Sequence, residues 1–337
     1  MGAEREPAFL ITIDTEGDDA WRAQGAVTTR NSAFLPRFQA LCERHGLAPT
    51  WLTNHEMASD HAFVAFGRDV LARGTGEVGM HLHAWNSPPL VPLRDLPDGH
   101  QAYLIEYPDE VMAAKIDALT DLLRATFDTP IVTHRAGRWA FDERYARLLA
   151  EQGYRVDCSV TPHVSWRAKL GAPDGAGGPD YTAFPEHPYR MAADDIGRPG
   201  GGPLLQAPMT IVAPGAADLR RHLTAVGGVL GRAFRRVLPP AHWLRPTGAN
   251  LHAMLAIVDR GRRERRAHLE FMLHSSELMP GGSPTFPNAA SIERLYAHLD
   301  AVFAAAREAG FVGCTLSAFE KRCQEPFLAA GPAENGS

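Results

Sequence analysis

The sequence predicts an α/β protein with a mainly parallel sheet. Short apolar, β-branched runs alternate with stretches of helical periodicity, and short connections join them. This alternation is typical of repeated strand–helix units, in which crossover helices link parallel strands. Because seven or eight such repeats can be counted, a closed or nearly closed α/β barrel accounts for them more economically than an open sheet.

The expected strands are rich in β-branched or aromatic residues, and several end in polar ones. They occupy residues 9–14, 49–53, 77–83, 130–135, 154–159, 204–212 and 269–274, with a last short strand or turn at 312–316. The expected helices show apolar residues at helical spacing. They occupy residues 31–42, 59–73, 108–127, 142–152, 218–237, 250–262 and 291–310.

The length allows one large α/β domain or two small ones. We expect a single catalytic barrel over residues 1–324, followed by a flexible tail at 325–337. Residues 161–202 are rich in Gly, Pro and His and show no periodicity. A loop of this length in a compact domain is usually functional, for example as a lid over a site.

The composition argues against several classes of protein. The 337 residues carry a formal net charge of −5, which is unlike a dedicated nucleic-acid binder. The four cysteines form no Cys-x-x-Cys pair, so neither a disulfide framework nor a zinc knuckle is expected. We find no signal peptide before the first strand and no apolar run long enough to cross a bilayer. We therefore expect a cytoplasmic protein.

The first predicted strand ends in a cluster of acids. The apolar run at 9–13 is followed by Asp14, Glu16, Asp18 and Asp19. Side chains two positions apart on a strand share a face, so the carboxylates of Asp14 and Glu16 should lie together. Two adjacent carboxylates repel each other unless a cation, a proton or an arginine compensates them. A turn with solvated acids is the alternative interpretation of this stretch alone.

The third predicted strand ends in two histidines. His81 and His83 place two imidazoles on one side of the strand. With a carboxylate from a neighbouring strand end, they would form a three-ligand site with open positions, as catalytic zinc, cobalt or iron sites require. A His-x-His pair alone is a weak signal and more often marks two ordinary surface or core histidines. Its place soon after a strand that ends in acids favours the metal site.

Two further strand ends carry polar candidates. Arg135 ends the fourth strand, where a guanidinium could hold a carboxylate ionised and orient it. His274 ends the seventh strand, where it could act as a general acid. A structural salt bridge or hydrogen bond is the alternative for each. Trp21, Trp85 and Trp139 follow polar strand ends and could form flat walls for a sugar ring or simply pack.

An ordered set of motifs resembles the polysaccharide deacetylases, the NodB-homology group or carbohydrate esterase family four. The set comprises Thr12-Ile-Asp14-x-Glu16, Glu77-Val-Gly-x-His81, Arg135-x-x-x-Trp139, Asp157-x-Ser159-Val and Leu273-His274. It covers residues 8–316, nearly the whole domain. The corner at 15–19 and the segment at 274–277 resemble a divergent, WbmS-like branch, which is tied to bacterial surface-polysaccharide (lipopolysaccharide) synthesis.

The resemblance implies a distorted (β/α)7-type barrel that uses a divalent metal, most often Zn2+, to hydrolyse an N- or O-acyl group of a saccharide. By position, the catalytic residues would be Asp14 as base, Arg135 as its orienting partner and His274 as general acid. The metal ligands would be Glu16, His81 and His83. The saccharide contacts would be Trp21, Trp85, Trp139 and Asp157.

Two positions depart from the common pattern of this family. Its first motif has adjacent aspartates, whereas Thr15 follows Asp14 here, so the clustered acids could exchange roles. Its second metal histidine lies four residues after the first, where this chain has Trp85, so His83 would have to substitute. A non-catalytic saccharide-binding protein on the same barrel is therefore an alternative. Another metal amidohydrolase is a second, although its His-x-His motif would follow the first strand, not the third.

Overall fold

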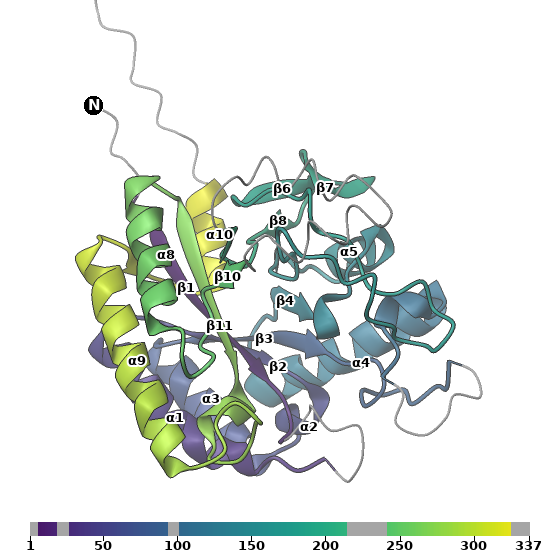
Figure 1. Cartoon of the computed structure of the whole chain (residues 1–337). Coiled ribbons are helices and arrows are strands. Elements are labelled where there is room, and N and C mark those ends of the chain that lie inside the picture. Colours follow the sequence, from purple (N-terminus) through teal and green to yellow (C-terminus); the bar gives the residue numbers. More distant parts are fainter. Residues whose placement is uncertain (1–5, 19–26, 94–100, 214–240, 325–337) are drawn as a thin grey trace, which may run out of the picture.

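The computed structural model of the chain describes residues 6–18, 27–93, 101–213 and 241–324. Its centre is a strongly curled, half-barrel sheet with helices packed on the outside (Figure 1). This arrangement confirms the α/β class and the distorted barrel that the sequence predicts. The expected helix at 218–237 and the expected tail at 325–337 lie outside the described residues. In the described ranges, no helix is both long and apolar enough to span a membrane.

The described residues form a ten-stranded sheet and a separate two-stranded one. Along the main sheet the order is β11-β1-β2-β3-β4-β5-β8-β6-β7, and β12 also pairs with β1. The strands are β1 (Ala8–Thr15), β2 (Thr50–Thr53), β3 (Glu77–Leu82), β4 (Thr133–Ala136), β5 (Val156–Asp157), β6 (Tyr189–Ala192), β7 (Asp195–Pro199), β8 (Leu205–Gln206), β9 (Ile211–Val212), β10 (His242–Trp243), β11 (His268–His274) and β12 (Val312–Gly313). Neighbours from β11 to β8 pair in parallel, whereas β6 is antiparallel to β8 and β7, and β9 to β10.

Helices connect most of the parallel strands. The α-helices are α1 (Leu35–Arg44), α2 (His55–Ala58), α3 (His61–Arg73), α4 (Asp109–Phe127), α5 (Glu143–Glu151), α8 (Leu251–Arg263), α9 (Ala289–Glu308) and α10 (Leu316–Gln324). Single 3-10 turns are η1 (Arg30–Phe34), η2 (Leu104–Glu106), η3 (Gly137–Trp139) and η4 (Ser275–Leu278). α8 and α9 pack together beside β1 and β11, while α3 and α4 pack on β3 (Figure 1).

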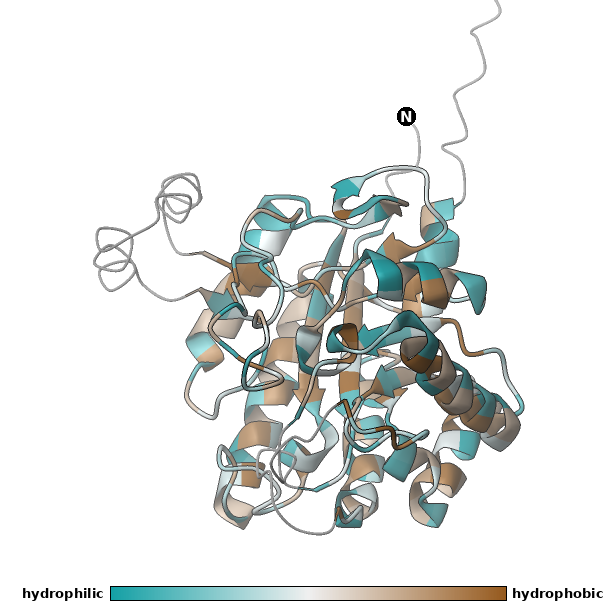
Figure 2. Ribbon diagram, turned by 90° about the vertical axis from the view of Figure 1, so that its right-hand side faces the viewer, coloured by the Kyte–Doolittle hydropathy of each residue, from teal (hydrophilic) through white to brown (hydrophobic). Residues whose placement is uncertain are grey.

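Aromatic side chains fix α9 onto the first strand pair. The ring centroids of Phe9 on β1 and Phe271 on β11 lie 6.5 Å apart, and Phe303 of α9 lies 6.0 and 5.5 Å from them. All three rings are buried, so they contribute both apolar burial and favourable edge or stacked contacts. Figure 2 shows hydrophobic residues gathered in the central strands, with hydrophilic residues on the outer faces of the helices.

The two edges of the half-barrel meet without a strand ladder. The backbone N–H of Glu270 on β11 donates to Thr210 Oγ1 at 2.8 Å, and His268 Nε2 donates to the carbonyl of Pro208 at 2.9 Å. The single strand expected over 204–212 is therefore wrong, because β8 and β9 are separate and the segment between them forms this seam. Pro208 has no N–H, so this segment does not continue a regular ladder.

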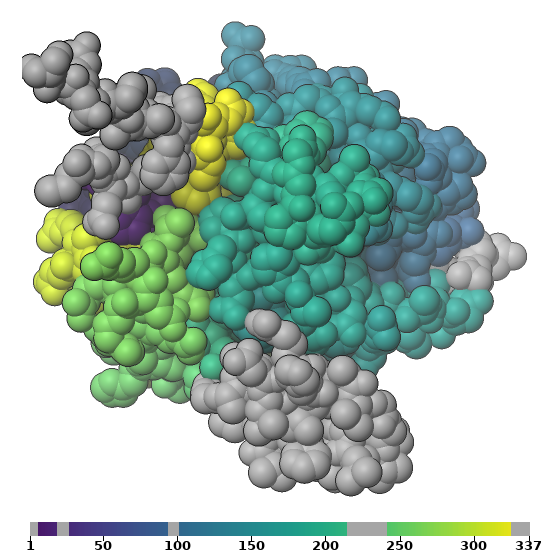
Figure 3. Space-filling view, turned by 90° about the horizontal axis from the view of Figure 1, so that it is seen from above, coloured from purple at the N-terminus to yellow at the C-terminus, as the bar shows by residue number. Residues whose placement is uncertain are grey.

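Two further elements differ from the sequence prediction. Residues 161–202, where a loop is predicted, also contain the antiparallel pair β6–β7 at the edge of the sheet. Helix α10 is not predicted. In Figure 3 it lies, in yellow, next to the teal middle segment of the chain. Arg190 Nη2 of β6 donates to Glu320 Oε1 of α10 at 2.5 Å, which ties the C-terminal helix to this edge.

Candidate active site and metal centre

The carboxyl ends of β1, β3, β4 and β11 bring most of the predicted site residues together. In the parallel registers, Asp14 lies opposite His274, and His81 lies opposite Arg135. Glu16 and His83 directly follow the last residues of β1 and β3. This is the end at which α/β barrels carry their active sites.

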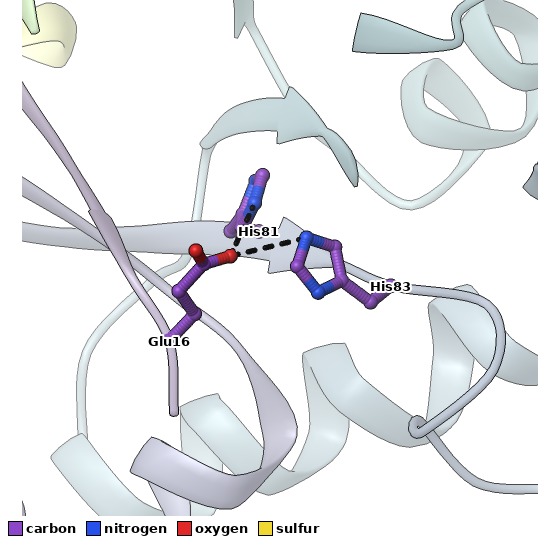
Figure 4. A group of neighbouring side chains, drawn as sticks. All are labelled: Glu16, His81 and His83. Carbon is purple, nitrogen blue, oxygen red and sulfur yellow. Dashed lines mark ion pairs between the residues drawn. The ribbon is translucent and has the colours of Figure 1, made fainter. Parts of the chain in front are cut away.

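Glu16, His81 and His83 form a compact group of metal-ligand types (Figure 4). One carboxylate oxygen and one nitrogen from each ring lie within 4.8 Å of one another. Glu16 Oε2 is 3.2 Å from His83 Nε2 and 3.6 Å from His81 Nε2, and Figure 4 shows both nitrogens on the side of the carboxylate. All three side chains are buried. His83 thus takes the third position of the group.

Groups behind the two imidazoles orient them. His81 Nδ1 donates to the carbonyl of Arg135 at 3.0 Å, so Nε2 keeps its lone pair on the side of Glu16. The His83 ring stacks on Trp85, with centroids 4.3 Å apart. Gly137 allows His83 to come close, because a Cβ atom there would lie 2.4 Å from His83 Cδ2. The ring orientations are therefore held by neighbours of the group as well as by the strand.

The electrostatics of this group favour a cation. Burial lowers the pKa of His83 to about 3, with a further contribution from His81, so the His83 ring is neutral and able to act as a ligand. Burial also lowers the pKa of His81, but Asp14 and Glu16 raise it by more. The two carboxylates thus draw positive charge to this point. One carboxylate and two imidazoles, buried and pre-oriented, fit a divalent ion such as zinc, cobalt or iron.

Arg135 compensates Asp14 inside the half-barrel. Arg135 Nη1 donates to Asp14 Oδ1 at 2.6 Å, and both side chains are buried. Burial raises the pKa of Asp14, but the charge of Arg135, together with His81 and His274, lowers it further, so the pKa lies well below its usual range. Asp14 is therefore ionised at neutral pH. This contact is the one expected of an orienting arginine.

Glu270 is a second carboxylate on Arg135 that the sequence analysis missed. Arg135 Nη2 donates to Glu270 Oε1 and, at 2.7 Å, to Thr12 Oγ1. Burial raises the pKa of Glu270 to about 7, although Arg135 and Thr12 act in the opposite direction. One guanidinium therefore holds Asp14 ionised but leaves Glu270 easy to protonate. An acid inside the apolar run 269–273 was the signal that could have identified it.

His274 lies on the other side of the two acids. Its Nε2 is 3.7 Å from Asp14 Oδ2 and 3.8 Å from Glu16 Oε1. Its Nδ1 is 3.0 Å from Arg245 Nη2 and 3.3 Å from Glu277 Oε2. Burial raises the pKa of Glu277, but Arg245 and His274 lower it to about 2, so Glu277 is an anion that fixes the ring. The nitrogen left on the side of the acids is Nε2.

A cavity of about 400 Å³ opens onto these residues. Its lining includes Asp14, the three ligand-type residues and His274. The rest of its wall consists of Trp85, Gln101, Tyr103, Ala136, Arg138, Trp139, Trp166, Lys169 and Arg245. Trp85 and Trp139 thus lie where the sequence predicts a wall. Tyr103, Arg138, Trp166, Lys169 and Arg245 were not predicted, because they come from connections without a periodic signal.

Two predicted or candidate residues lie elsewhere, and the position of a third is not described. Asp157 is fully buried, accepts from His134 Nδ1 at 2.7 Å and does not line the cavity, so it is not placed to contact a saccharide. The reason is its register opposite His134 on β4, where the two side chains satisfy each other. Asp18 accepts from the backbone N–H of Asn31 at 2.9 Å and so holds the start of η1. Trp21 lies outside the described residues.

The fold and the site together define a half-barrel with a candidate metal centre at the carboxyl end of its strands. No protein-family model and no curated protein sequence matches the chain. A "putative polysaccharide deacetylase" from Mycobacterium smegmatis matches with a TM-score of 0.50 at 14% identity, over 96% of this chain and 92% of that one. A "putative glycoside hydrolase/deacetylase" from Parabacteroides distasonis matches with a TM-score of 0.59 at 11% identity, over 96% of this chain and 73% of that one.

A 4-α-glucanotransferase from Thermococcus litoralis matches with a TM-score of 0.51 at 13% identity. The match covers 94% of this chain but only 40% of that longer enzyme. These likenesses show that the chain has the distorted barrel of the polysaccharide deacetylases. At such identities they concern the fold alone.

Proposed function

We propose that this protein is a metal-dependent deacetylase that removes an N- or O-acyl group from a saccharide. The observation that carries the proposal is the placement of Glu16, His81 and His83 beside an ionised Asp14 and an oriented His274, at one cavity. A ligand group, a base and an acid are the parts that hydrolysis of an amide or ester requires. The distorted barrel of polysaccharide deacetylases supports the same assignment.

A divalent ion held by Glu16, His81 and His83 would polarise the acyl carbonyl and make water a stronger nucleophile. Asp14 accepts a proton from the attacking water, and Arg135 keeps that carboxylate ionised and in position. The water oxygen bonds to the acyl carbon, and the bond from that carbon to the sugar nitrogen or oxygen breaks. His274, oriented through Arg245 and Glu277, gives a proton to the leaving atom. The products are a carboxylate and the free amine or hydroxyl of the sugar.

We assign zinc as the ion and a sugar or sugar precursor of bacterial surface-polysaccharide synthesis as the substrate, in the cytoplasm. The zinc assignment is supported by the nitrogen-rich ligand set. The saccharide assignment is supported by the tryptophans of the cavity wall and by the names of the three similar structures, each of which refers to saccharide chemistry. The pathway and the compartment are supported by the sequence motifs and composition.

The test is acetate release from N- and O-acetylated saccharides by zinc-loaded protein. We expect one metal ion per chain and an activity that disappears with a chelator and returns with zinc. Asp14→Asn should lower the rate by roughly 10²–10⁴-fold, the usual contribution of a general base. Turnover that is indifferent to both the chelator and this substitution would refute the mechanism.

A non-catalytic saccharide-binding protein is the second candidate. The observation that favours it is Trp85, which occupies the position of the usual family ligand and stacks on His83 instead. Metal analysis separates the two functions. A chain that takes up no zinc after reconstitution, yet binds oligosaccharides, would be a binding protein; stoichiometric zinc with acetate release would be an enzyme.

A further inference from the structure

Two basic residues stand in the cavity wall beyond the metal-ligand group. Arg138 follows β4 in the 3-10 turn η3, and Lys169 belongs to the connection between β5 and β6. Both line the same cavity as Asp14 and His274. The proposed hydrolysis gives neither residue a role, although both line the cavity that the substrate would enter.

Among the residues that the structure describes, the hydrogen bonds of Arg138 leave its charge uncompensated. Its guanidinium donates to two backbone carbonyls, that of Gln101 and, at 2.9 Å, that of Leu170. Carbonyl oxygens orient a guanidinium but carry no net charge. Within the described ranges, neither Arg138 nor Lys169 forms an ion pair with a carboxylate.

The other described charges of the cavity have partners or belong to the ligand group. Asp14 pairs with Arg135, and Arg245 pairs with Glu277 at 3.2 Å. Glu16 belongs to the group that would hold a dication. A divalent ion would therefore leave this end of the cavity positive, and Arg138 and Lys169 add two further positive charges. Such a cavity attracts an anionic ligand and disfavours a cationic one.

A fixed frame holds the two basic residues. Tyr103 Oη donates to the carbonyl of Lys169 at 2.8 Å, and the guanidinium of Arg138 lies 4.3 Å from the centroid of the Tyr103 ring. Arg138 and Trp139 have φ angles of 54° and 63°, in the left-handed region that such residues rarely adopt. Backbone strain of this kind persists where the surroundings enforce it, often at ligand sites. Here the strained turn brings a cation and a flat ring to one wall.

We propose that the saccharide substrate carries an anionic group, a carboxylate or a phosphate, which Arg138 and Lys169 bind. The substrate class would then be acidic sugars, such as uronic acids or glycosyl phosphates, with the sugar ring against Trp139 or Trp166. The inference rests on the proposed function for the reaction. The anion site itself stands on the wall residues alone and can be tested without turnover.

Equilibrium binding of three sugars of similar size tests the proposal. D-glucuronate, glucose 1-phosphate and glucose are titrated into the full-length protein, followed by calorimetry or by the fluorescence of the wall tryptophans. Titrations are run with zinc and after chelation, because an anion could also bind a metal directly. We expect at least one anionic sugar to bind on the order of tenfold more tightly than glucose in both states, with a preference that weakens as salt is added.

Substitutions of the wall residues locate the anion site. Lys169→Gln and Arg138→Gln should each remove most of the preference, and Lys169→Arg should keep it. Lys169 is exposed and anchors no other element through its side chain, so its substitution should not affect folding. Arg167→Gln is the matched control, since Arg167 is an exposed cation of the same loop, lies 3.5 Å from Asp180 and does not line the cavity.

Each outcome decides a point. Preference for glucuronate alone supports a uronic acid, and preference for glucose 1-phosphate alone supports a glycosyl phosphate. If glucose binds as tightly as both anions, or if the preference survives both the Lys169 and the Arg138 substitution, the proposal is overturned. Because the chelated protein is included, the anion site can stand while the deacetylase proposal fails, and the reverse can also occur.

Discussion

Gly137 controls how closely His83 approaches Glu16. A Cβ atom at this position would lie 2.4 Å from His83 Cδ2 and 2.4 Å from the carbonyl oxygen of Leu82. The backbone oxygen does not move easily, so Gly137→Ala should push the His83 ring and the end of β3 away from residue 137. We expect zinc affinity to fall by roughly 10–100-fold, as for the loss of a group that orients a metal ligand. Competition with a chromogenic chelator measures the change.

Gly201→Ala is the control for this substitution. No atom lies within 4 Å of the corresponding Cβ position at Gly201, so neither zinc affinity nor thermal stability should change. If Gly137→Ala binds zinc as tightly as the unsubstituted protein, His83 is not a ligand and the proposed three-residue centre is wrong.

The placement of single side chains could be predicted from the sequence where the position of a residue on a strand fixes the face to which its side chain points. Asp14 and Glu16, like His81 and His83, follow the two-residue alternation of extended chain, so their shared faces could be deduced. Glu270 obeys the same rule but was missed, because its neighbours suggest only a buried apolar strand. Asp157 was misplaced for the opposite reason, since a strand-end acid reveals nothing about the histidine that hydrogen-bonds to it.

At the scale of elements, the sequence predicted most α-helices and most of the parallel strands within a few residues. Strong periodicity and clear helix signals made this possible; for example, Asp60 accepts from the N–H of Phe63 at the start of α3, and Gly74 ends that helix in the left-handed conformation. The pair β6–β7 was missed because its residues show no apolar alternation. The two strands form because they pair with each other and because β6 pairs with β8. Such pairing depends on tertiary contacts, which the local sequence does not reveal.

The connection at 161–188 is anchored to the turn between α8 and β11 through one carboxylate. Glu186 Oε1 lies 3.0 Å from His163 Nε2, and Glu186 Oε2 accepts from Arg266 Nη2 at 2.9 Å. The hydrogen bond from His163, together with Arg266, lowers the pKa of Glu186 to about 2 from an ordinary value of 4.5. A lowered folded-state pKa stabilises the fold above about pH 4.5, and this stabilisation is lost as the pH falls toward 2.

Glu186→Gln should therefore lower the free energy of unfolding at pH 7 by about 1–2 kcal/mol, a charged hydrogen bond discounted for partial exposure. Urea unfolding at pH 7 and pH 3 checks the sign, since the difference between variant and unsubstituted protein should shrink at the lower pH. Glu293→Gln is the control, because the Glu293–Arg37 pair is largely exposed and its loss should be too small to resolve. An equal destabilisation at both pH values would contradict the assigned role.

At the scale of the whole molecule, a polar core crosses the concave face of the curled sheet. Arg135 of β4 reaches Thr12 and Asp14 of β1 and Glu270 of β11, and its Nε donates to the carbonyl of Cys158 at 3.3 Å. Strand repeats indicated a barrel, but they could not show that its seam would be a few isolated hydrogen bonds rather than a ladder. Which residues meet across the interior depends on curvature, which local sequence does not encode.

This polar core should make stability depend on pH in a recognisable way. The folded-state pKa of Glu270, about 7, lies above its ordinary value of 4.5, because burial disfavours the carboxylate and Asp14 shares its one arginine. The folded protein therefore binds an extra proton between pH 4.5 and 7, and its stability falls as the pH rises through that window. The size of this loss is of order 1–3 kcal/mol.

Glu270→Gln removes the titrating group but keeps its shape. Relative to the unsubstituted protein, the variant should gain stability as the pH rises from 4.5 to 7 and show a constant difference above pH 7. Urea unfolding of the two chelated proteins across pH 4.5–8 gives this difference curve, in which the titrations of all other groups largely cancel. Parallel curves would mean that Glu270 is already ionised at pH 4.5. Arg135 would then pair with two carboxylate anions at once. The conclusion that Arg135 keeps Asp14 ionised at the expense of Glu270 would be wrong.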